Sequence, residues 1–447
     1  MTSDIPSHGI LQLVVVVILL ATPAAAEVCF DAAAPLLLGE TERANAVAVG
    51  DLDGDGRADV VTANDATDKI FVFFALEAGG YAAPVVWPSG NEPVDLALAD
   101  VDGDGALDVI TADQSSSAWG ILFNDGLGGL ALRDSVDASM APNSLDVLDL
   151  DDDGYVDLMT TAGADSSLVI VFGRGDGTFE QRIVLPTGAT PNASGAADLD
   201  GDGDLDLVAS SFEARSVTRY VHDGARGFTV AGADTLGSSL FGLAVGEFDG
   251  APGPDVAVSL GFTNEVAILP NDGSGAFGAP LTVATGQGPF VLEASDLDCD
   301  GLDEILTGNL VGDDVTVLEN QGNGSFSAPS AVSTGVNPGS FAVADVDGDG
   351  APDVTAPYQG GVVVATNTCP ATACLVATDA RTPRAGTLDR VEAYPNPFNP
   401  RTTLAFDLRR RATVSLVLYD AAGRRVRSLL AEAAMDAGSH ATVWDGR

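Results

Sequence analysis

Residues 51–59 read DLDGDGRAD, and closely related stretches return six more times along the 447-residue chain. The later stretches begin at Asp100, Asp149, Asp198, Glu247, Asp296 and Asp345, each 49 residues after the one before. They read DVDGDGALD, DLDDDGYVD, DLDGDGDLD, EFDGAPGPD, DLDCDGLDE and DVDGDGAPD. A fixed period near 50 residues is typical of solenoids, propellers and other repeat arrays.

Each repeat unit contains four short β-rich runs. In the third unit, residues 144–150 (SLDVLDL) lead into the acidic stretch and residues 157–162 (DLMTTA) lead out of it. The runs 168–172 (LVIVF) and 179–185 (FEQRIVL) follow, with the turn sequence GRGDG between them. Four strands per unit and seven units predict an all-β fold, a seven-bladed β-propeller over residues 27–370. A right-handed β-helix is disfavoured because its rungs are shorter.

The last unit supplies only three strands, so we expect the fourth to come from the N-terminal end. Ala34-Pro35 stands 16 residues before Asp51, as Ala279-Pro280 does before Asp296. The segment APLLLGE (34–40) is therefore predicted to be an orphan fourth strand that completes the seventh blade and closes the ring.

The same register places two of the four cysteines opposite each other. Cys369 falls at the position of Asn320 and Cys29 at that of Asn323, and these asparagines flank the short turn between strands 3 and 4. A Cys29–Cys369 disulfide would replace the missing turn. The alternatives are Cys29–Cys374 and a local Cys369–Cys374 link, because an even number of cysteines does not fix the pairing.

The acidic stretches have the composition of calcium-binding loops. Calcium takes about six to eight oxygen ligands, and the side chains at positions 1, 3, 5 and 9 with the carbonyl of position 7 supply them. Glycines at positions 4 and 6 permit the tight turn. A metal-free Asp-Gly turn is the alternative, but carboxylates this close repel one another unless a cation neutralises them. EF-hands are excluded because position 12 holds Thr62, inside a strand, in place of a bidentate Glu.

The predicted calcium ligands fall in six of the seven loops. They are Asp51, Asp53, Asp55, Arg57 and Asp59; Asp100, Asp102, Asp104, Ala106 and Asp108; Asp149, Asp151, Asp153, Tyr155 and Asp157; Asp198, Asp200, Asp202, Asp204 and Asp206; Asp296, Asp298, Asp300, Leu302 and Glu304; and Asp345, Asp347, Asp349, Ala351 and Asp353. The sixth loop is altered, with Cys299 where glycine is usual. The fifth is expected to be empty or weak, because Ala251 replaces the central ligand. We therefore expect five or six ions per chain.

The units resemble FG-GAP/VCBS repeats, the blades of the integrin α-subunit propeller and of many bacterial surface proteins. The resemblance rests on the D-x-D-G-D-G-x-x-D stretches and on the downstream segments GRGDGTF (173–179), NDGSGAF (271–277) and NQGNGSF (320–326). It covers about residues 30–368. It implies a propeller fold and says little about function, since propellers host unrelated activities.

The charge is extreme, with 65 acidic and 20 basic residues and a net charge of −45. Nucleic acid and anionic membranes would repel such a chain, whereas metal cations are natural partners. The acids are unevenly placed, because 57 of them but only 9 of the basic residues precede residue 371. This break predicts a domain boundary there.

The N-terminus predicts export. Residues 10–20 are apolar, and Ala24-Ala25-Ala26 forms an A-x-A cleavage pattern before Glu27. The apolar run is too short to span a bilayer comfortably. We therefore expect residues 1–26 to be a signal peptide and the protein to be secreted or held at the outer cell surface; the alternatives are a misassigned start codon and a membrane anchor.

The tail carries a second resemblance. Residues 371–390 are expected to be a linker. Residues 391–447 resemble the immunoglobulin-like C-terminal module of type IX secretion cargo and flagellar hook-capping proteins, on the evidence of YPNPFNP (394–400), Tyr419-Asp420 and WDGR (444–447). That family continues for two more strands beyond the Trp-Asp-Gly, so either the sequence is a fragment or the resemblance implies a partial, truncated sorting module.

The sequence contains no recognisable set of catalytic residues. His222 and His440 are expected to be solvated loop residues, and no G-x-S-x-G or H-E-x-x-H motif occurs. The predicted function is a monomeric adhesion or interaction module for a protein or glycan; the alternative is a calcium-dependent polysaccharide lyase or glycosidase. The expected binding face, opposite the acidic loops, carries the 2–3 and 4–1 loops with Trp119, Phe212, Arg215, Phe262 and Tyr358, unless these only cover the blade ends.

Overall fold

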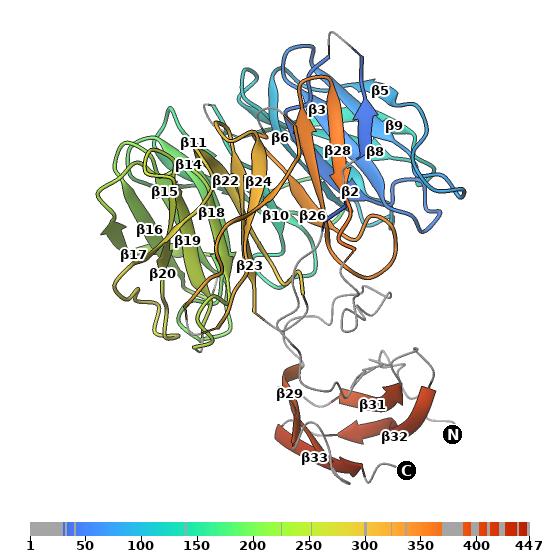
Figure 1. Cartoon of the computed structure of the whole chain (residues 1–447), viewed down its shortest axis with the longest axis vertical. Coiled ribbons are helices and arrows are strands. Elements are labelled where there is room, and N and C mark those ends of the chain that lie inside the picture. Colours follow the sequence, from blue (N-terminus) through green and yellow to red (C-terminus); the bar gives the residue numbers. More distant parts are fainter. Residues whose placement is uncertain are drawn as a thin grey trace, which may run out of the picture. The chain divides into compact units, whose positions relative to one another are not determined.

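The computed structural model (Figure 1) describes most of the repeat region and the strands of the tail. The described residues are 30–31, 34–39, 42–138, 141–224, 226–251, 253–298, 302–322, 324–335, 338–368, 388–394, 402–408, 412–419, 425–435 and 438–444. Residues 27–369 form one compact unit, and the tail belongs to a second. Within the described residues, no helix is long and apolar enough to cross a membrane.

The repeat region folds into seven four-stranded antiparallel sheets, which confirms the predicted seven-bladed propeller. Blades 1 to 4 consist of β2 (Ala46–Gly50), β3 (Asp59–Asn64), β4 (Lys69–Phe73) and β5 (Val85–Pro88); β6 (Pro93–Ala99), β7 (Asp108–Asp113), β8 (Ala118–Asn124) and β9 (Leu130–Asp137); β10 (Asp146–Leu148), β11 (Asp157–Ala162), β12 (Ser167–Val171) and β13 (Ile183–Pro186); β14 (Pro191–Ala197), β15 (Asp206–Ser211), β16 (Ser216–His222) and β17 (Phe228–Thr235). Blades 5 to 7 consist of β18 (Leu243–Gly246), β19 (Asp255–Leu260), β20 (Glu265–Leu269) and β21 (Leu281–Ala284); β22 (Pro289–Ser295), β23 (Glu304–Asn309), β24 (Asp314–Leu318) and β25 (Ser330–Val332); and β26 (Ala342–Ala344), β27 (Asp353–Tyr358), β28 (Gly361–Ala365) and β1 (Ala34–Leu37).

The ring closes as predicted, with the N-terminal strand in the last blade. Strand β1 pairs antiparallel with β28, and the pairing extends to a bridge between Phe30 and Asn367. The backbone N–H of Asp31 donates to the carbonyl of Thr366 at 2.9 Å. Cys29 and Cys369 lie outside the described residues, so their disulfide stays a prediction.

The core is divided among the joints between blades. The described part of the ring holds seven apolar clusters, one between each pair of neighbouring blades. The second strand of each blade is packed on both faces; all six residues of β3 and all six of β7 are buried. Such strands are apolar or β-branched without alternation because no face meets water.

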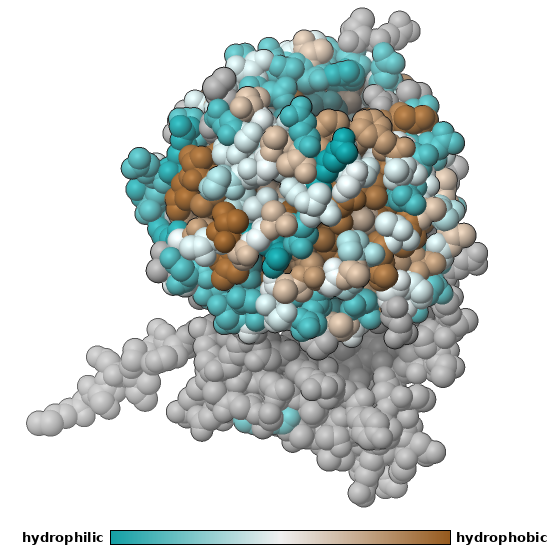
Figure 2. Space-filling view, turned by 90° about the vertical axis from the view of Figure 1, so that its left-hand side faces the viewer, coloured by the Kyte–Doolittle hydropathy of each residue, from teal (hydrophilic) through white to brown (hydrophobic). Residues whose placement is uncertain are grey.

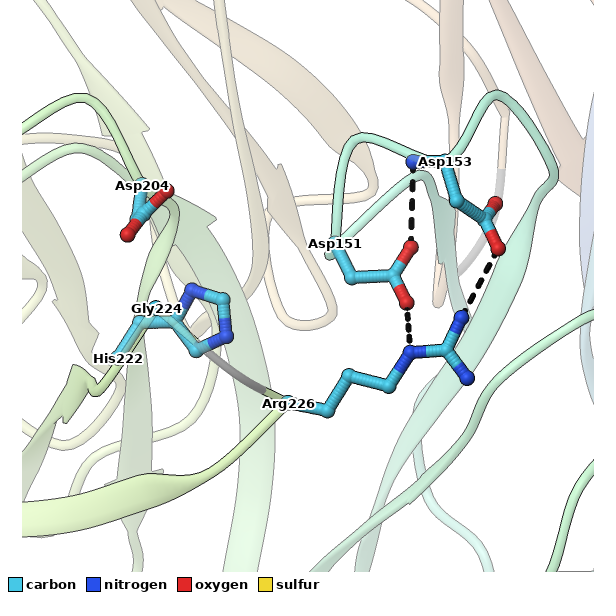
Figure 3. Close-up of a pocket in the computed structure, with 6 residues that line it drawn as sticks. All are labelled: Asp151, Asp153, Asp204, His222, Gly224 and Arg226. Carbon is cyan, nitrogen blue, oxygen red and sulfur yellow. Dashed lines mark hydrogen bonds and ion pairs between the residues drawn. The ribbon is translucent and has the colours of Figure 1, made fainter.

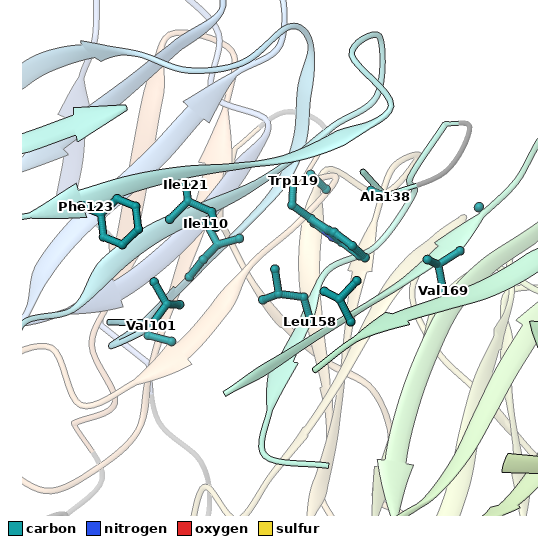
Figure 4. Packing of buried hydrophobic residues seen from close by; sticks show 12 residues of the cluster. Val101, Ile110, Trp119, Ile121, Phe123, Ala138, Leu158 and Val169 are labelled. Carbon is teal, nitrogen blue, oxygen red and sulfur yellow. The ribbon is translucent and has the colours of Figure 1, made fainter. Parts of the chain in front are cut away.

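Trp119 belongs to one of these joints, which corrects the prediction that it lies on the binding face. It has no exposed surface and packs among Ile110, Ile121 and Leu158 between blades 2 and 3 (Figure 4). The reason is its place inside β8, a third strand whose seven residues are all buried between neighbouring blades.

The tail is also all-β in its described parts. Strands β29 (Leu388–Tyr394), β30 (Thr402–Leu408) and β33 (Gly438–Trp444) form one sheet, and β31 (Ala412–Tyr419) and β32 (Arg425–Met435) form another. Its assignment as an immunoglobulin-like sorting module stays a prediction. The expected signal peptide and most of the expected linker lie outside the described residues.

Candidate metal centres

The last acid of each loop is built into the blade. Asp59 opens β3 and has no exposed surface. Its Oδ2 accepts a hydrogen bond from the N–H of Leu52 at 2.9 Å, and its Oδ1 accepts one from the N–H of Ala75 at 2.8 Å. The acids at position 9 of the other six loops make the same pair of contacts, at Asp108, Asp157, Asp206, Asp255, Glu304 and Asp353. This carboxylate therefore ties the acidic loop to the end of the third strand.

The first acid holds the turn together. Asp51 Oδ1 accepts from the N–H of Gly54 and Oδ2 accepts from the N–H of Gly56, both at 2.8 Å. Both glycines have positive φ, 74° and 85°, as the prediction from their positions requires. Asp100, Asp198 and Asp345 accept the equivalent hydrogen bonds in their loops.

The acids at positions 1, 3 and 9 converge. Among the described residues, six groups of acidic side chains place one potential ligand atom of each residue within 4.8 Å of the others. Five of these groups are Asp51, Asp53 and Asp59; Asp100, Asp102 and Asp108; Asp149, Asp151 and Asp157; Asp198, Asp200 and Asp206; and Asp296, Asp298 and Glu304. Such groups of carboxylate oxygens fit the ligand preference of calcium.

The predicted ligand at position 5 is not part of these five groups. Its carboxylate turns to its own loop: Asp55 Oδ1 accepts from the N–H of Arg57 at 3.0 Å, and Asp104 makes the same contact with Ala106 at 2.9 Å. Asp153, Asp202 and Asp349 do likewise in their loops. Asp300 lies outside the described residues.

Burial raises the pKa of the acids at position 9, and nearby carboxylates raise it further, although backbone hydrogen bonds oppose the shift. The pKa of Asp108 and that of Asp353 rise to about 6, that of Asp157 to about 7 and that of Glu304 to about 8. A negative charge there is costly without a cation. The donor set therefore fits a bound calcium ion, which would relieve that cost.

The fifth loop differs from the others. Asp249 Oδ1 accepts a hydrogen bond from the N–H of Ala251 at 2.7 Å, and Ala251 offers no carboxylate of its own. The N–H of Glu247 donates to Asp303, in the loop of the next blade, at 2.8 Å. Burial raises the pKa of Glu247, and repulsion from Asp255 and Asp303 raises it further. We keep the prediction that this loop is empty or weak.

Four of the acidic loops accept a hydrogen bond from an asparagine side chain of the next blade. Asn124, which ends β8 in blade 2, donates from Nδ2 to the carbonyl of Leu52 in the loop of blade 1 at 2.8 Å. The pattern recurs from Asn271 to Leu199 at 2.8 Å, from Asn320 to Phe248 at 3.1 Å and from Asn367 to Leu297 at 3.2 Å. The sequence marked Asn320 only as the register position of Cys369 and predicted no inter-blade role for these asparagines, although three of them begin the turn sequences at the 49-residue period. A metal ion in the loop would therefore order a joint between two blades.

The joint between blades 3 and 4 is different. A pocket of about 370 Å³ there is lined by Asp151, Asp153, Asp204, His222, Gly224 and Arg226 (Figure 3). Arg226 pairs with Asp151 through Nε, with Asp153 at 2.9 Å and with Glu180 at 3.1 Å. Its guanidinium lies 4.9 Å from the ring centroid of Phe172.

Both histidines correct the expectation of solvated loops. His222 ends β16, is 6% exposed and stacks on Phe228 with the ring centroids 4.6 Å apart. It is buried because it occupies the place of Asn124 at the blade joint: its N–H donates to Asp206 at 2.9 Å as that of Asn124 donates to Asp108. His440 lies within β33, where it is paired with β30, and it is partly buried.

The opposite face carries an aromatic group that we call the phenylalanine cluster: Phe212, Phe241, Phe262 and Phe290. Centroids of contacting rings are 5.1–6.1 Å apart. Phe262 is 71% exposed and Phe290 is 39% exposed. Figure 2, from the side of blades 4 and 5, shows apolar residues grouped among polar ones on the described surface. The sequence singled out Phe212 and Phe262 but not their partners.

Geometry and repeats together define a seven-bladed β-propeller with acidic loops on one face. Residues 51–111, 149–209 and 308–356 match the FG-GAP-like repeat model. The β-propeller thus contains FG-GAP-like repeats in these three segments. No curated protein sequence matches the chain.

Solved structures with similar folds have low sequence identity to the chain. A chain from the crystal structure of BBS1N in complex with ARL6DN shares 14% identity at a TM-score of 0.56, covering 78% of this chain and 98% of that one. An inactive virginiamycin B lyase from Staphylococcus aureus shares 13% identity at a TM-score of 0.50, covering 76% and 99%. A lectin from Agrocybe aegerita shares 18% identity at a TM-score of 0.46, covering 65% and 80%. The first two likenesses show a shared fold alone.

Proposed function

We propose that the protein is a calcium-stabilised interaction module, secreted or held at the outer cell surface, that binds a protein or glycan ligand. The observation that carries the proposal is the phenylalanine cluster, where loops of blades 4 and 5 and the start of blade 6 bring four aromatic rings together. Exposed aromatic side chains grouped on one face are favoured in binding sites.

The acidic loops support the structural half of the proposal. They lie on the other face, beside the 3–4 turns, where a bound ion would connect strands within a blade and neighbouring blades. Such an ion would stabilise folding by mass action without touching the ligand. The phenylalanine cluster would then stay in place as long as the ring is intact.

A binding screen tests the proposal. The purified full chain is applied to a glycan array and to candidate extracellular proteins, with calcium and with chelator. A Phe262→Ser, Phe290→Ser double variant should lose the ligand, because both side chains are exposed and their removal leaves the core unchanged. Leu127→Ser is the matched control, since Leu127 is 80% exposed in a 3–4 turn on the other face.

Two results would contradict the proposal. One is a ligand that binds the double variant as well as the unaltered protein, since the face would then be wrong. The other is an unaltered protein that binds no calcium and has the same melting temperature with calcium as with chelator. The acidic loops would then have no calcium-dependent structural role. Glycan and protein arms of the screen separate the two classes of ligand.

A calcium-dependent polysaccharide lyase or glycosidase is the second candidate. One observation favours it: burial raises the pKa of Glu293, on the first strand of blade 6, to about 8. A carboxyl that stays protonated at neutral pH can serve as a general acid. Polysaccharide depolymerisation by the purified protein that is lost in Glu293→Gln would support this candidate over the first.

A further inference from the structure

Arg226 stands where the other turns have glycine. The 49-residue register aligns it with Gly79, Gly128, Gly177, Gly275 and Gly324. All five glycines have positive φ, between 68° and 84°, and Arg226 keeps that conformation with φ of 63°. Residues with a side chain adopt the left-handed region at a conformational cost, so the arginine requires a compensating interaction.

Its neighbours show what that interaction is. A Cβ atom built on Gly128 would lie 3.4 Å from the Cβ of Asp53, the third-position acid in the loop of the preceding blade. Gly177 has the same relation to Asp102 at 3.4 Å. A side chain at this position of the turn therefore starts beside the metal-ligand group of the neighbouring loop. Arg226 is the side chain that does so, and it starts beside Asp151.

The guanidinium is held on several sides. Nε pairs with Asp151, whose side chain is only 6% exposed, and the two Nη atoms pair with Asp153 and Glu180. Phe172 packs against it, at the place where Phe123 meets Gly177 in the preceding joint. Two predicted ligands of the third loop thus already face a fixed positive charge (Figure 3).

The same turn carries a second change. The asparagine that begins the turns of blades 2, 5 and 6 is replaced by His222. Neither ring nitrogen of His222 has a hydrogen-bond partner. The joint between blades 3 and 4 therefore lacks the asparagine-to-carbonyl hydrogen bond. The ion pair between Arg226 and Asp151 connects the two blades next to that position.

We propose that Arg226 is the resident cation of the third acidic loop, taking the place that a calcium ion has in the other loops. The inference rests on the proposed calcium binding by those loops. A calcium ion at Asp151 would have to displace the guanidinium and then lie beside it, and two cations at this range repel strongly. The third loop therefore stays metal-free at calcium concentrations that fill loops 1, 2, 4 and 7, and the blade 3–4 joint does not depend on calcium.

Counting ions tests the inference on the full chain. Bound calcium is measured by equilibrium dialysis and elemental analysis for the unaltered protein, Arg226→Gln, Arg226→Gly and Arg226→Lys. The glutamine and glycine variants should each bind one more ion per chain, because the third loop loses its internal cation. The lysine variant should keep the original count, because the charge is retained. Glycine is the residue of five other turns, so that variant is expected to fold.

Melting in chelator gives an independent readout. Without calcium, Arg226→Gln should melt several degrees below the unaltered protein, and added calcium should restore most of the difference. Equal ion counts in the unaltered protein and both neutral variants, with calcium bound to other loops, would overturn the inference alone. If the unaltered protein binds no calcium, the proposed function is wrong. The role of Arg226 in the third loop is then tested by the melting temperatures of Arg226→Gln and the unaltered protein in chelator, and equal temperatures would overturn it.

Discussion

The side-chain amide of Asn124 donates to the backbone carbonyl of Leu52, 72 residues earlier in the chain, at 2.8 Å. The bond joins the turn of one blade to the acidic loop of the blade before. The same amide also donates to Leu107 of its own blade at 2.9 Å. The side chain of Asn124 thus donates hydrogen bonds to two backbone carbonyls, one in each of two neighbouring blades.

Asn124→Ala should destabilise the ring, because it removes the side-chain donor from one buried and one partly buried carbonyl. The loss is about 2 kcal/mol at the usual cost of unsatisfied buried groups, which thermal melting detects as a shift of a few degrees. The converse change, His222→Asn, should raise the melting temperature, because it restores a donor at the equivalent joint. Equal melting temperatures for all three proteins would mean that this hydrogen bond does not stabilise the joint.

Calcium occupancy should depend on the loop that is altered. Asp200→Asn removes a carboxylate from the converging group of the fourth loop and should lower the bound calcium by one ion per chain. Asp249→Asn is the matched control at the same position of the fifth loop, where we expect no strong site. Elemental analysis of the two variants beside the unaltered protein measures the difference. A loss of one ion from both variants would show that the fifth loop is filled.

Stability should fall as pH rises, through groups outside the acidic loops. Burial raises the pKa of Asp95 to about 6, that of Asp146 to about 7 and that of Glu293 to about 8. In the unfolded chain such carboxyls titrate near pH 4, so the folded protein holds protons that the unfolded chain has released. The free energy of unfolding therefore decreases between about pH 4 and pH 8 for these groups.

Glu293→Gln isolates this effect. The variant should melt above the unaltered protein at pH 9, where the glutamate is forced to ionise inside the fold, and at the same temperature near pH 5. Melting is compared at one saturating calcium concentration, so that metal release does not enter. The exposed Glu213→Gln serves as the control and should show no pH-dependent difference. A Glu293→Gln effect of equal size at both pH values would contradict the role of ionisation.

The ring should be covalently closed by Cys29–Cys369. Strand pairing is described as far as Phe30, which follows Cys29 directly, and Asn367, which is two residues before Cys369. A disulfide there would close a loop of over 300 residues and contribute about 4–5 kcal/mol on the chain-entropy model. Peptide mapping without reductant should recover the 29–369 pair, and reduction should lower the melting temperature. Recovery of Cys29 as a free thiol, or joined to Cys374, would refute this pairing.

The sequence by itself determined the architecture of the repeat region, because its information is periodic. A 49-residue register fixes the number of blades, places each acidic loop between strands 1 and 2, and assigns the missing fourth strand to the segment 34–40, within which the structure has β1. Each of these features depends on local turn and strand chemistry that is repeated seven times. The convergence of Asp51, Asp53 and Asp59 follows from the same loop.

The tertiary structure decided what neighbouring blades do to each other. Contacts between residues of different blades determine whether His222 and Trp119 are exposed. They also determine which acidic side chain Arg226 faces. Residue type says little about them: Trp119 and Phe262 are both aromatic, yet one fills a blade joint and the other is open to solvent. The period could have marked Arg226 as the exception among glycines. Only the packing of blade 4 on blade 3 shows that its charge lies within the third acidic loop.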